Sequence, residues 1–190
     1  MARATAKSSA RERLLTAADE LFYDEGIRSV GIDRVIEHAG VAKASLYNTF
    51  GSKDKLIQAY LKGRHEKIAT RISAAVQAAE TPRERLLAVF DAQGVLYAES
   101  GFRGCPFVRA NAEARPGDTV DRATSDYRAW VRSLFTELAE QAGASDPEAL
   151  ARALHMVYDG AVLSARSEHD PGASAAARAA AGVLLDATLS

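Results

Sequence analysis

Residues 32–50 read IDRVIEHAGVAKASLYNTF, and this stretch decides how the N-terminal part of the chain folds. Its first half has an apolar residue at every third or fourth position, which predicts a two-turn helix with one buried face, formed by Ile32, Val35, Ile36 and Ala39. Gly40 comes next, and a glycine there permits the left-handed turn that often ends a helix. A second short helix is predicted over 42–49, with Leu46 and Phe50 on its inner side. Two short helices joined by a glycine turn and packed on a longer preceding helix form a helix-turn-helix unit.

The outward residues of the second helix are small or hydrogen-bonding and include no acid, as expected for a helix that enters the groove of anionic DNA. They are Lys43, Ala44, Ser45, Tyr47, Asn48 and Thr49. Lys43 can donate to guanine, Ser45 can bond either base, and the Ala44 methyl group can pack on thymine. For Tyr47, the alternative is a place at the edge of the unit's own core.

Further cations flank this unit. Lys53 stands in the first turn of the next predicted helix, where a cation opposes the helix dipole unless a phosphate shares the site. Arg34, on the exposed side of the first helix of the pair, is a second candidate for phosphate contact. Three basic residues precede the first acid of the chain and form either a solvated tail or a minor-groove contact: Arg3, Lys7 and Arg11.

This region resembles the TetR/AcrR family of bacterial transcriptional repressors. The resemblance runs from Arg11 to about Ile68 and rests on AADELF at 17–22, EG at 25–26, AGV at 39–41, LYNTF at 46–50 and SKDKL at 52–56. It implies that Tyr47 and Lys53 hold DNA phosphates and that residues 43–45 meet bases. Two positions depart from the family pattern. Gly31 stands where Thr or Ser usually begins the second helix, and Ala42 replaces a frequent serine, which costs about 1 kcal/mol of helix capping.

The composition fits a folded protein of medium size. The chain has 190 residues, 47% of them hydrophobic, and carries 24 Lys or Arg against 25 Asp or Glu, a formal net charge of −1. This balance excludes a polycationic coat protein and an acidic disordered chain. One cysteine and four scattered histidines argue against a disulfide or a structural zinc site. The basic N-terminus leads into no apolar stretch, so we expect a cytoplasmic protein with neither a signal peptide nor a membrane span.

The proline positions and the apolar spacing predict an all-α protein. Thr81-Pro82-Arg83-Glu84 has the pattern of a capping box with proline at the first helical position. Residues 145–148 and Asp170-Pro171 carry similar start signals, and no alternating β-branched run or tight hairpin turn appears. We expect nine helices, at about 9–25, 32–38, 42–49, 53–79, 82–99, 105–114, 118–142, 147–167 and 172–188.

Two domains are expected: a helix-turn-helix DNA-binding domain at 1–52 and an effector-binding and dimerisation domain at 53–190. The charge distribution agrees with this division, because residues 1–65 hold 11 Lys or Arg against 8 Asp or Glu whereas the remainder is acidic. A mildly basic head on an acidic body indicates an anionic partner for the head alone.

The C-terminal domain combines large apolar and aromatic residues with a few polar ones, which is the composition of a drug-sized cavity wall. The candidate effector-binding residues are Phe90, Gln93, Tyr97, Phe107, Asn111, Tyr127, Trp130, His155 and Asp159. The alternative is that they fill an ordinary helical core. Residues 104–107 (GCPF), followed by Asn111-Ala112-Glu113, resemble the LmrA/YxaF-like branch of the family. That resemblance implies a small hydrophobic or aromatic effector.

The end of the chain predicts a dimer interface. Small residues from Ala173 to Gly182, followed by Val183, Leu184 and Leu185, let helix backbones approach closely. Two helices from each of two subunits would form a four-helix bundle with a two-fold axis. Such a dimer sets two reading helices about 34 Å apart along a duplex, which matches a palindromic operator.

Together these features predict a ligand-responsive repressor that binds its operator as a homodimer, uses no cofactor or metal and is not an enzyme. One alternative is an activator or architectural DNA-binding protein without an effector. Another is a small helical enzyme with Cys105 as a reactive thiol, although no histidine stands near Cys105 in sequence to act as a base. His155 and Asp159, one helical turn apart, can bind a metal or tie two core helices together.

Overall fold

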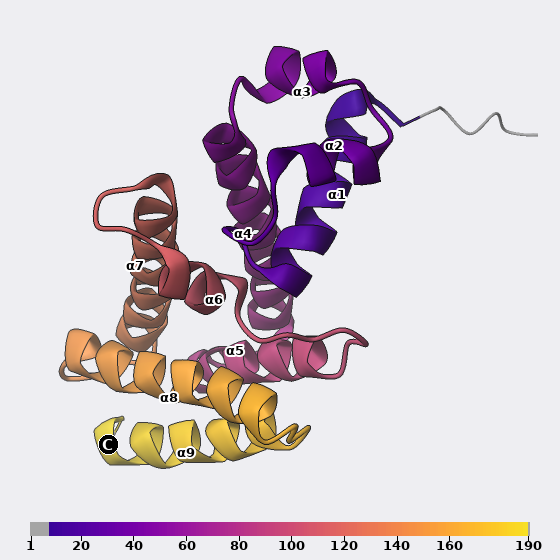
Figure 1. The fold of residues 1–190 in the computed structure, drawn as a ribbon. Coiled ribbons are helices and arrows are strands. Elements are labelled where there is room, and N and C mark those ends of the chain that lie inside the picture. Colours follow the sequence, from indigo (N-terminus) through magenta and orange to yellow (C-terminus); the bar gives the residue numbers. More distant parts are fainter. Residues whose placement is uncertain (1–7, 190) are drawn as a thin grey trace, which may run out of the picture. The chain divides into compact units, whose positions relative to one another are not determined.

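The computed structural model describes residues 8–189, and within that range the chain forms nine α-helices and no strand (Figure 1). The all-α prediction is therefore confirmed. Arg3 and Lys7, which we considered for minor-groove contact, lie outside the described residues.

The helix bounds lie within two residues of those expected. The helices are α1 (Ala10–Glu25), α2 (Ile32–Ala39), α3 (Lys43–Phe50), α4 (Lys53–Ala78), α5 (Pro82–Tyr97), α6 (Pro106–Glu113), α7 (Thr119–Gln141), α8 (Pro147–Ser167) and α9 (Ala173–Thr188). Of the described residues, no helix is both long enough and apolar enough to span a bilayer.

Capping interactions explain several of these boundaries. At the start of α5, the Glu84 N–H donates to the Thr81 hydroxyl at 3.2 Å, and the Thr81 N–H donates to the Glu84 carboxylate at 3.1 Å. This is the predicted capping box, with Pro82 at the first helical position. The side chain of Asp146 caps α8 by accepting from the Ala149 N–H at 2.9 Å.

The chain divides into two compact units. One contains the residues up to Arg64 together with Pro106–Thr124, and the other contains His65–Cys105 and the residues from Ser125 onward. The first unit, here called the head unit, holds α1 to α3, the beginning of α4, α6 and the beginning of α7. The second, here called the body unit, holds the rest of α4, α5, most of α7, α8 and α9.

The core of the head unit is formed where α1, α2 and α3 meet. Its fully buried side chains come from every one of these helices and from α4: Leu14, Ala18, Val35, Leu46, Leu56 and Leu61. Neither of the two short helices could persist by itself in water, because helices of eight residues are far below the length at which an isolated helix is stable. Packing on α1 therefore determines where α2 and α3 lie.

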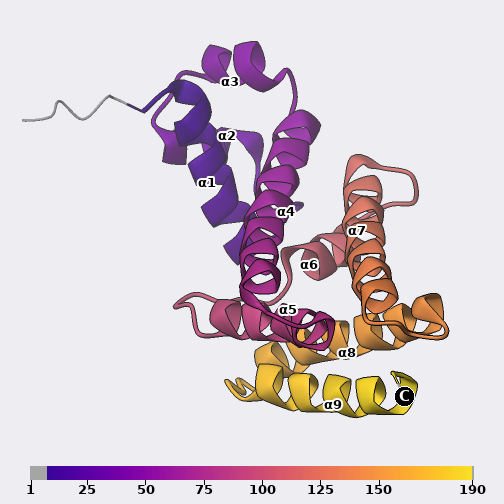
Figure 2. The ribbon, with the colours of Figure 1, turned by 180° about the vertical axis from the view of Figure 1, so that it is seen from behind.

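In the body unit, α8 and α9 lie side by side and both pack against α5 (Figures 1 and 2). Gly94 allows the approach of α9, because a Cβ atom at that position would lie 2.4 Å from the Ser174 hydroxyl. Ion pairs fasten the edges of this contact: Arg83 to Asp186 at 2.6 Å and Arg178 to Asp91 at 3.1 Å.

The α1–α2 connection of the head unit is held by α6. Gly26 ends α1 with φ 97° and ψ 150°, a conformation that in practice requires glycine. The Glu113 carboxylate fills the space beside it, since a Cβ atom on Gly26 would lie 2.6 Å from Oε1. The other carboxylate oxygen accepts from the Arg28 N–H at 2.7 Å. Glu113 thus replaces the side chain that Gly26 lacks and fixes the loop that leads into α2.

We predict that Gly26→Ala destabilises the protein by about 1–3 kcal/mol, because alanine must adopt a glycine conformation and displace the Glu113 carboxylate. Urea unfolding measures the change. Gly63→Ala is the matched control, because Gly63 lies within α4 with nothing within 4 Å of its added methyl group. That control should gain about 0.5–1 kcal/mol from helix propensity. Equal stability of the two variants would contradict this account of the loop.

Candidate nucleic-acid interface and ligand site

The turn between α2 and α3 has the left-handed geometry that its glycine predicts. Gly40 has φ 59° and ψ 42°, and its N–H returns to the carbonyl groups of Ile36 and Glu37. From α1, the guanidinium of Arg13 donates to the Gly40 carbonyl at 3.0 Å. The turn is therefore fixed both by its own backbone bonds and by a side chain of the supporting helix.

Helix α3 is anchored on one side and open on the other. Leu46 is fully buried, and Phe50 is half-buried with the Arg11 guanidinium 5.8 Å from its ring centroid. The six residues predicted to contact DNA lie on the other side of the helix. Lys43, Ala44, Tyr47, Asn48 and Thr49 are exposed, and Ser45 is half-buried. The structure thus brings all six onto one short helix whose exposed surface contains no acid.

Two of the predicted DNA-binding cations are held in exposed ion pairs. Lys43 contacts Asp33 at 2.8 Å, and this hydrogen bond raises the pKa of the lysine. Arg34 contacts Glu25 at 2.6 Å. Exposed ion pairs of this kind contribute little to stability. Both cations can therefore exchange their carboxylate partner for a phosphate or a base edge at small cost.

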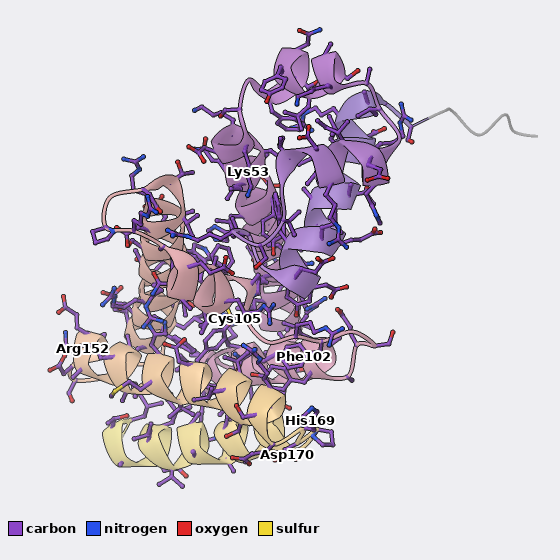
Figure 3. The ribbon with its side chains drawn as sticks, viewed as in Figure 1. Lys53, Phe102, Cys105, Arg152, His169 and Asp170 are labelled. Carbon is purple, nitrogen blue, oxygen red and sulfur yellow. The ribbon has the colours of Figure 1, made fainter. Side chains whose placement is uncertain are left out.

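Lys53 lies in the first turn of α4, as expected, but it is partly engaged within the head unit (Figure 3). Its ammonium donates to the Ile27 carbonyl at 2.8 Å and lies 5.9 Å from the centroid of the Phe22 ring. Burial lowers its pKa, against the opposing effects of Asp54 and Glu113. An ammonium has three N–H donors, so two remain beyond the bond to Ile27.

Arg64 is a structural residue that the sequence pattern did not reveal. It donates to the Asp19 carboxylate at 2.5 Å, and its guanidinium lies 4.0 Å from the centroid of the Tyr23 ring. Both partners are on α1, which no local spacing connects to position 64. The sequence signal available for Arg64 was its position four residues after Tyr60 in an amphipathic helix, and this position does not identify the residues that it contacts.

In the body unit, several predicted effector-binding residues converge on Tyr158 of α8. Gln93 of α5 donates its side-chain amide to the Tyr158 carbonyl at 3.1 Å. The hydroxyl groups of Tyr127 and Tyr158 lie 3.0 Å apart. The imidazole of His155, one turn earlier on α8, has its ring centroid 6.4 Å from that of Tyr158. We call Gln93, Tyr97, Tyr127, His155 and Tyr158 the buried polar cluster.

Three polar atoms of this cluster have no hydrogen-bond partner among the described residues: Gln93 Oε1, Tyr97 Oη and His155 Nε2. Their residues are 5%, 9% and 5% exposed, respectively. An unsatisfied buried donor or acceptor costs about 1–3 kcal/mol. The cluster therefore has spare hydrogen-bonding capacity that an ordinary helical core would not contain.

Burial also sets the charge of the cluster. It raises the pKa of the Tyr97, Tyr127 and Tyr158 hydroxyl groups, and it lowers the pKa of His155 against the attraction of Asp159. The phenols are therefore protonated and the imidazole is neutral at pH 7. Asp159 is half-buried and bound to Arg128 at 2.7 Å, while its nearest approach to His155 is 3.8 Å.

The other predicted effector residues lie in different settings. Trp130 is half-buried and makes an edge-on ring contact with His65 of α4 at a centroid distance of 4.8 Å. Phe90 is fully buried against Phe135. Phe107 and Asn111 belong to the head unit, whereas the buried polar cluster belongs to the body unit. Phe107 is buried and Asn111 is exposed. Their role in effector binding remains a prediction.

Within residues 8–189, no group of three or more His, Cys, Asp or Glu side chains could hold a metal ion. His155 and Asp159 stand as a pair whose carboxylate is bound to an arginine. Cys105 is half-buried in the segment that joins α5 to α6, where Figure 3 labels it near Phe102.

Two family profiles match the chain. "Bacterial regulatory proteins, tetR family" matches residues 14–60, and "Tetracyclin repressor-like, C-terminal domain" matches residues 82–181, which is more than half of the chain. The HTH-type transcriptional activator FasR of Mycolicibacterium smegmatis is 35% identical over 82 residues, which are 43% of this chain and 37% of FasR.

Two further matches each cover most of the chain. The HTH-type transcriptional regulator LmrA of Bacillus subtilis is 26% identical over 143 residues, covering 73% of this chain and 76% of LmrA. The crystal structure of SCO4454, a TetR-family transcriptional regulator from Streptomyces coelicolor, matches with a TM-score of 0.89 and 37% identity, covering 95% of this chain and 96% of that one. From the two profiles and this fold, the chain belongs to the TetR family of DNA-binding transcriptional regulators.

Proposed function

We propose that this protein is a repressor that binds a palindromic operator as a homodimer, and that a small apolar or aromatic effector releases it from DNA. The observation that carries this proposal is the acid-free exposed face of α3, held in place by the buried Leu46. A rigid helix with small and hydrogen-bonding side chains on its outer face has the shape and chemistry needed to enter a major groove.

Within this proposal, the exposed residues of the head unit divide into two kinds. Lys43, Ala44 and Ser45, at the start of α3, read base edges, because the first residues of a recognition helix reach furthest into the groove. The others position the helix on the sugar-phosphate backbone: Tyr47, Asn48, Thr49, Lys53 and Arg34. Tyr47 is 46% exposed, an unusual amount for a tyrosine that serves only its own core.

Replacement of Lys43 tests base reading. Lys43→Ala should weaken binding to a duplex selected from a random pool by about tenfold or more and relax the preference at one base pair.

Lys53→Ala tests the phosphate contact. It should weaken binding to all DNA sequences alike and reduce the slope of log affinity against log salt concentration by about one. Fluorescence anisotropy at several salt concentrations measures both effects. Arg132→Ala, a loss of one exposed charge on α7 of the body unit, should leave DNA affinity unchanged. Similar losses in all three variants would refute the assigned interface.

The dimer is proposed to form through α8 and α9. Their exposed sides carry the large apolar residues Met156, Leu163 and Val183, which are 70%, 63% and 70% exposed. Between them lie Gly160 on α8 and a run of exposed alanines on α9, which allow close approach of a second copy. Large exposed apolar residues on two neighbouring helices of a folded protein are typical of an interaction site.

A charge placed on this surface should separate the subunits. We expect Leu163→Glu to give a monomer in sedimentation experiments, because a carboxylate would be buried without a counter-charge. Operator affinity should fall more than 100-fold, since one head alone meets half of the site. Ser133→Glu places the same charge at an exposed position of α7, away from α8 and α9, and should remain dimeric. A Leu163→Glu variant that stays dimeric would move the interface to another face.

Helix α4 is the proposed link between effector and DNA. Its residues Arg64 and His65 are neighbours in the chain, yet their side chains belong to different units. Arg64 binds Asp19 and Tyr23 of α1, whereas His65 packs against Tyr127 and Trp130 with ring centroids at 5.5 and 4.8 Å. A ligand that moves Tyr127 would therefore act on the same helix that supports the head. Linkage then requires DNA to weaken ligand binding by the factor by which the ligand weakens DNA binding.

Activation of transcription is the second candidate, favoured by the similarity to FasR, which is an activator. The assignments of α3 are the same in both cases, so the sign of regulation needs its own experiment. Transcription from a template that carries the selected operator, with purified RNA polymerase, should fall when our protein is added. A rise would establish the activator instead.

A further inference from the structure

The buried polar cluster of the body unit is built for a partner that the chain itself does not supply. Gln93 Oε1 and Tyr97 Oη are both unpartnered, and they stand one turn apart on the same face of α5. His155 Nε2, also unpartnered, approaches from α8. Buried polar atoms in native proteins are nearly always hydrogen-bonded, so three such atoms on the packed helices α5 and α8 point to a missing guest.

The unpartnered atoms define what the guest must offer. A side-chain carbonyl oxygen such as Gln93 Oε1 accepts hydrogen bonds and cannot donate. The amide group of Gln93 is held by its bond to the Tyr158 carbonyl at 3.1 Å, which fixes the direction of Oε1. The guest must therefore donate an O–H or N–H to Gln93. The Tyr97 hydroxyl can donate or accept, so it can complete a second bond to the same polar group.

The charges around the cluster exclude an ionic guest. Its three phenols are protonated and its imidazole is neutral, as derived above from their burial. The nearest carboxylate, Asp159, is neutralised by Arg128 at 2.7 Å. Arg128 and Arg132 act on His155 from outside the cluster. A carboxylate or an ammonium ion beside Gln93 and Tyr97 would be desolvated without an opposite charge among the cluster's own side chains.

Aromatic rings form the apolar part of the surroundings. The Phe102 ring lies 5.0 Å from that of Tyr97, and the Phe135 ring lies 6.0 Å from that of Tyr158. Flat ligands gain from offset and edge-on contacts with such rings. Figure 3 labels Phe102 in the segment that follows α5.

We propose that the buried polar cluster binds an uncharged aromatic molecule through a hydroxyl or N–H group that donates to Gln93 and bonds the hydroxyl of Tyr97. This inference rests on the proposed function, since it names the chemical class of the effector. Phenols and neutral aromatic amides belong to the class, and the corresponding carboxylates do not.

Matched probes test the class of ligand. The neutral donors phenol, 2-naphthol and 4-phenylphenol should bind the dimer at pH 7.5 in calorimetry, and the best of them at least tenfold more tightly than its carboxylate counterpart (benzoate, 2-naphthoate or 4-phenylbenzoate). It should also bind at least tenfold more tightly than the hydrocarbon without a hydroxyl. Equal or tighter binding of the carboxylate overturns the proposal, and so does the absence of binding by all three neutral probes, which would mean that water fills the cluster.

Variants of the cluster separate a ligand site from a structural one. Tyr97→Phe removes an unpartnered buried hydroxyl, so it should raise the thermal midpoint of the free protein by about 2–4 °C. The same variant should weaken binding of the best probe at least fivefold, as should Gln93→Met. Tyr60→Phe, a buried tyrosine of the head unit, is the control and should leave probe binding unchanged. Unchanged probe binding in Tyr97→Phe and Gln93→Met overturns the assignment.

Measuring operator binding on the same samples keeps this inference apart from the proposed function. With the probe bound, operator affinity should fall, and the probe should bind more weakly to the DNA complex by the same factor. If the protein binds the operator but no neutral probe, the proposed ligand class is wrong and the DNA-binding function stands. If a neutral probe binds the cluster but no operator is found, the proposed function fails while the cluster remains a ligand site.

Discussion

Burial of Leu46 is the contact on which the rest of the proposed DNA-reading surface depends. An eight-residue helix has almost no stability of its own, and α3 also lacks a capping side chain at Ala42. Its position comes from one fully buried leucine, from Phe50 beside Arg11, and from a turn fixed by Gly40 and Arg13. Because these anchors lie on one side of the helix, every other residue of α3 is free to be chosen for DNA.

Helix α6 of the head unit supports the loop that joins α1 to α2. The loop after α1 passes through a conformation that only glycine adopts easily, and Gly26 leaves a space there. The Glu113 carboxylate occupies that space, and Lys53 holds the next carbonyl of the loop. The ammonium that we assign to a DNA phosphate is thus also a support of the α1–α2 loop. A change at α6 or at the first turn of α4 acts on the loop that leads into α2.

Much of this molecule could be predicted from its sequence, because the strongest signals are local. The Thr81-Pro82-Arg83-Glu84 capping box, the left-handed Gly40 and the apolar spacing of α2 each involve residues within one or two turns. The hydrogen bonds of Arg64 with Asp19 and of Glu113 with Arg28 join residues 45 and 85 positions apart. No spacing rule connects such pairs, since their meeting depends on how whole helices pack.

For the same reason, the sequence could name the candidate effector residues but could not show which of them lie together. Gln93 and Tyr127 meet at Tyr158, whereas Phe107 and Asn111 fall in the head unit.

If the buried polar cluster binds the proposed effector, its unpartnered atoms affect both the stability of the free protein and the affinity for that ligand. Unpartnered atoms at Gln93, Tyr97 and His155 lower the stability of the ligand-free protein. A ligand that satisfies them therefore recovers free energy that the free protein lacks, in addition to what its apolar surface contributes. Part of its affinity comes from relieving this defect, and it is available to molecules that donate a hydrogen bond at the right place. A well-packed apolar core at the same site would be more stable and would distinguish poorly between an aromatic alcohol and a plain hydrocarbon. In the proposed complex, the stability that the free protein lacks at Gln93 and Tyr97 thus becomes selectivity for a ligand that donates a hydrogen bond.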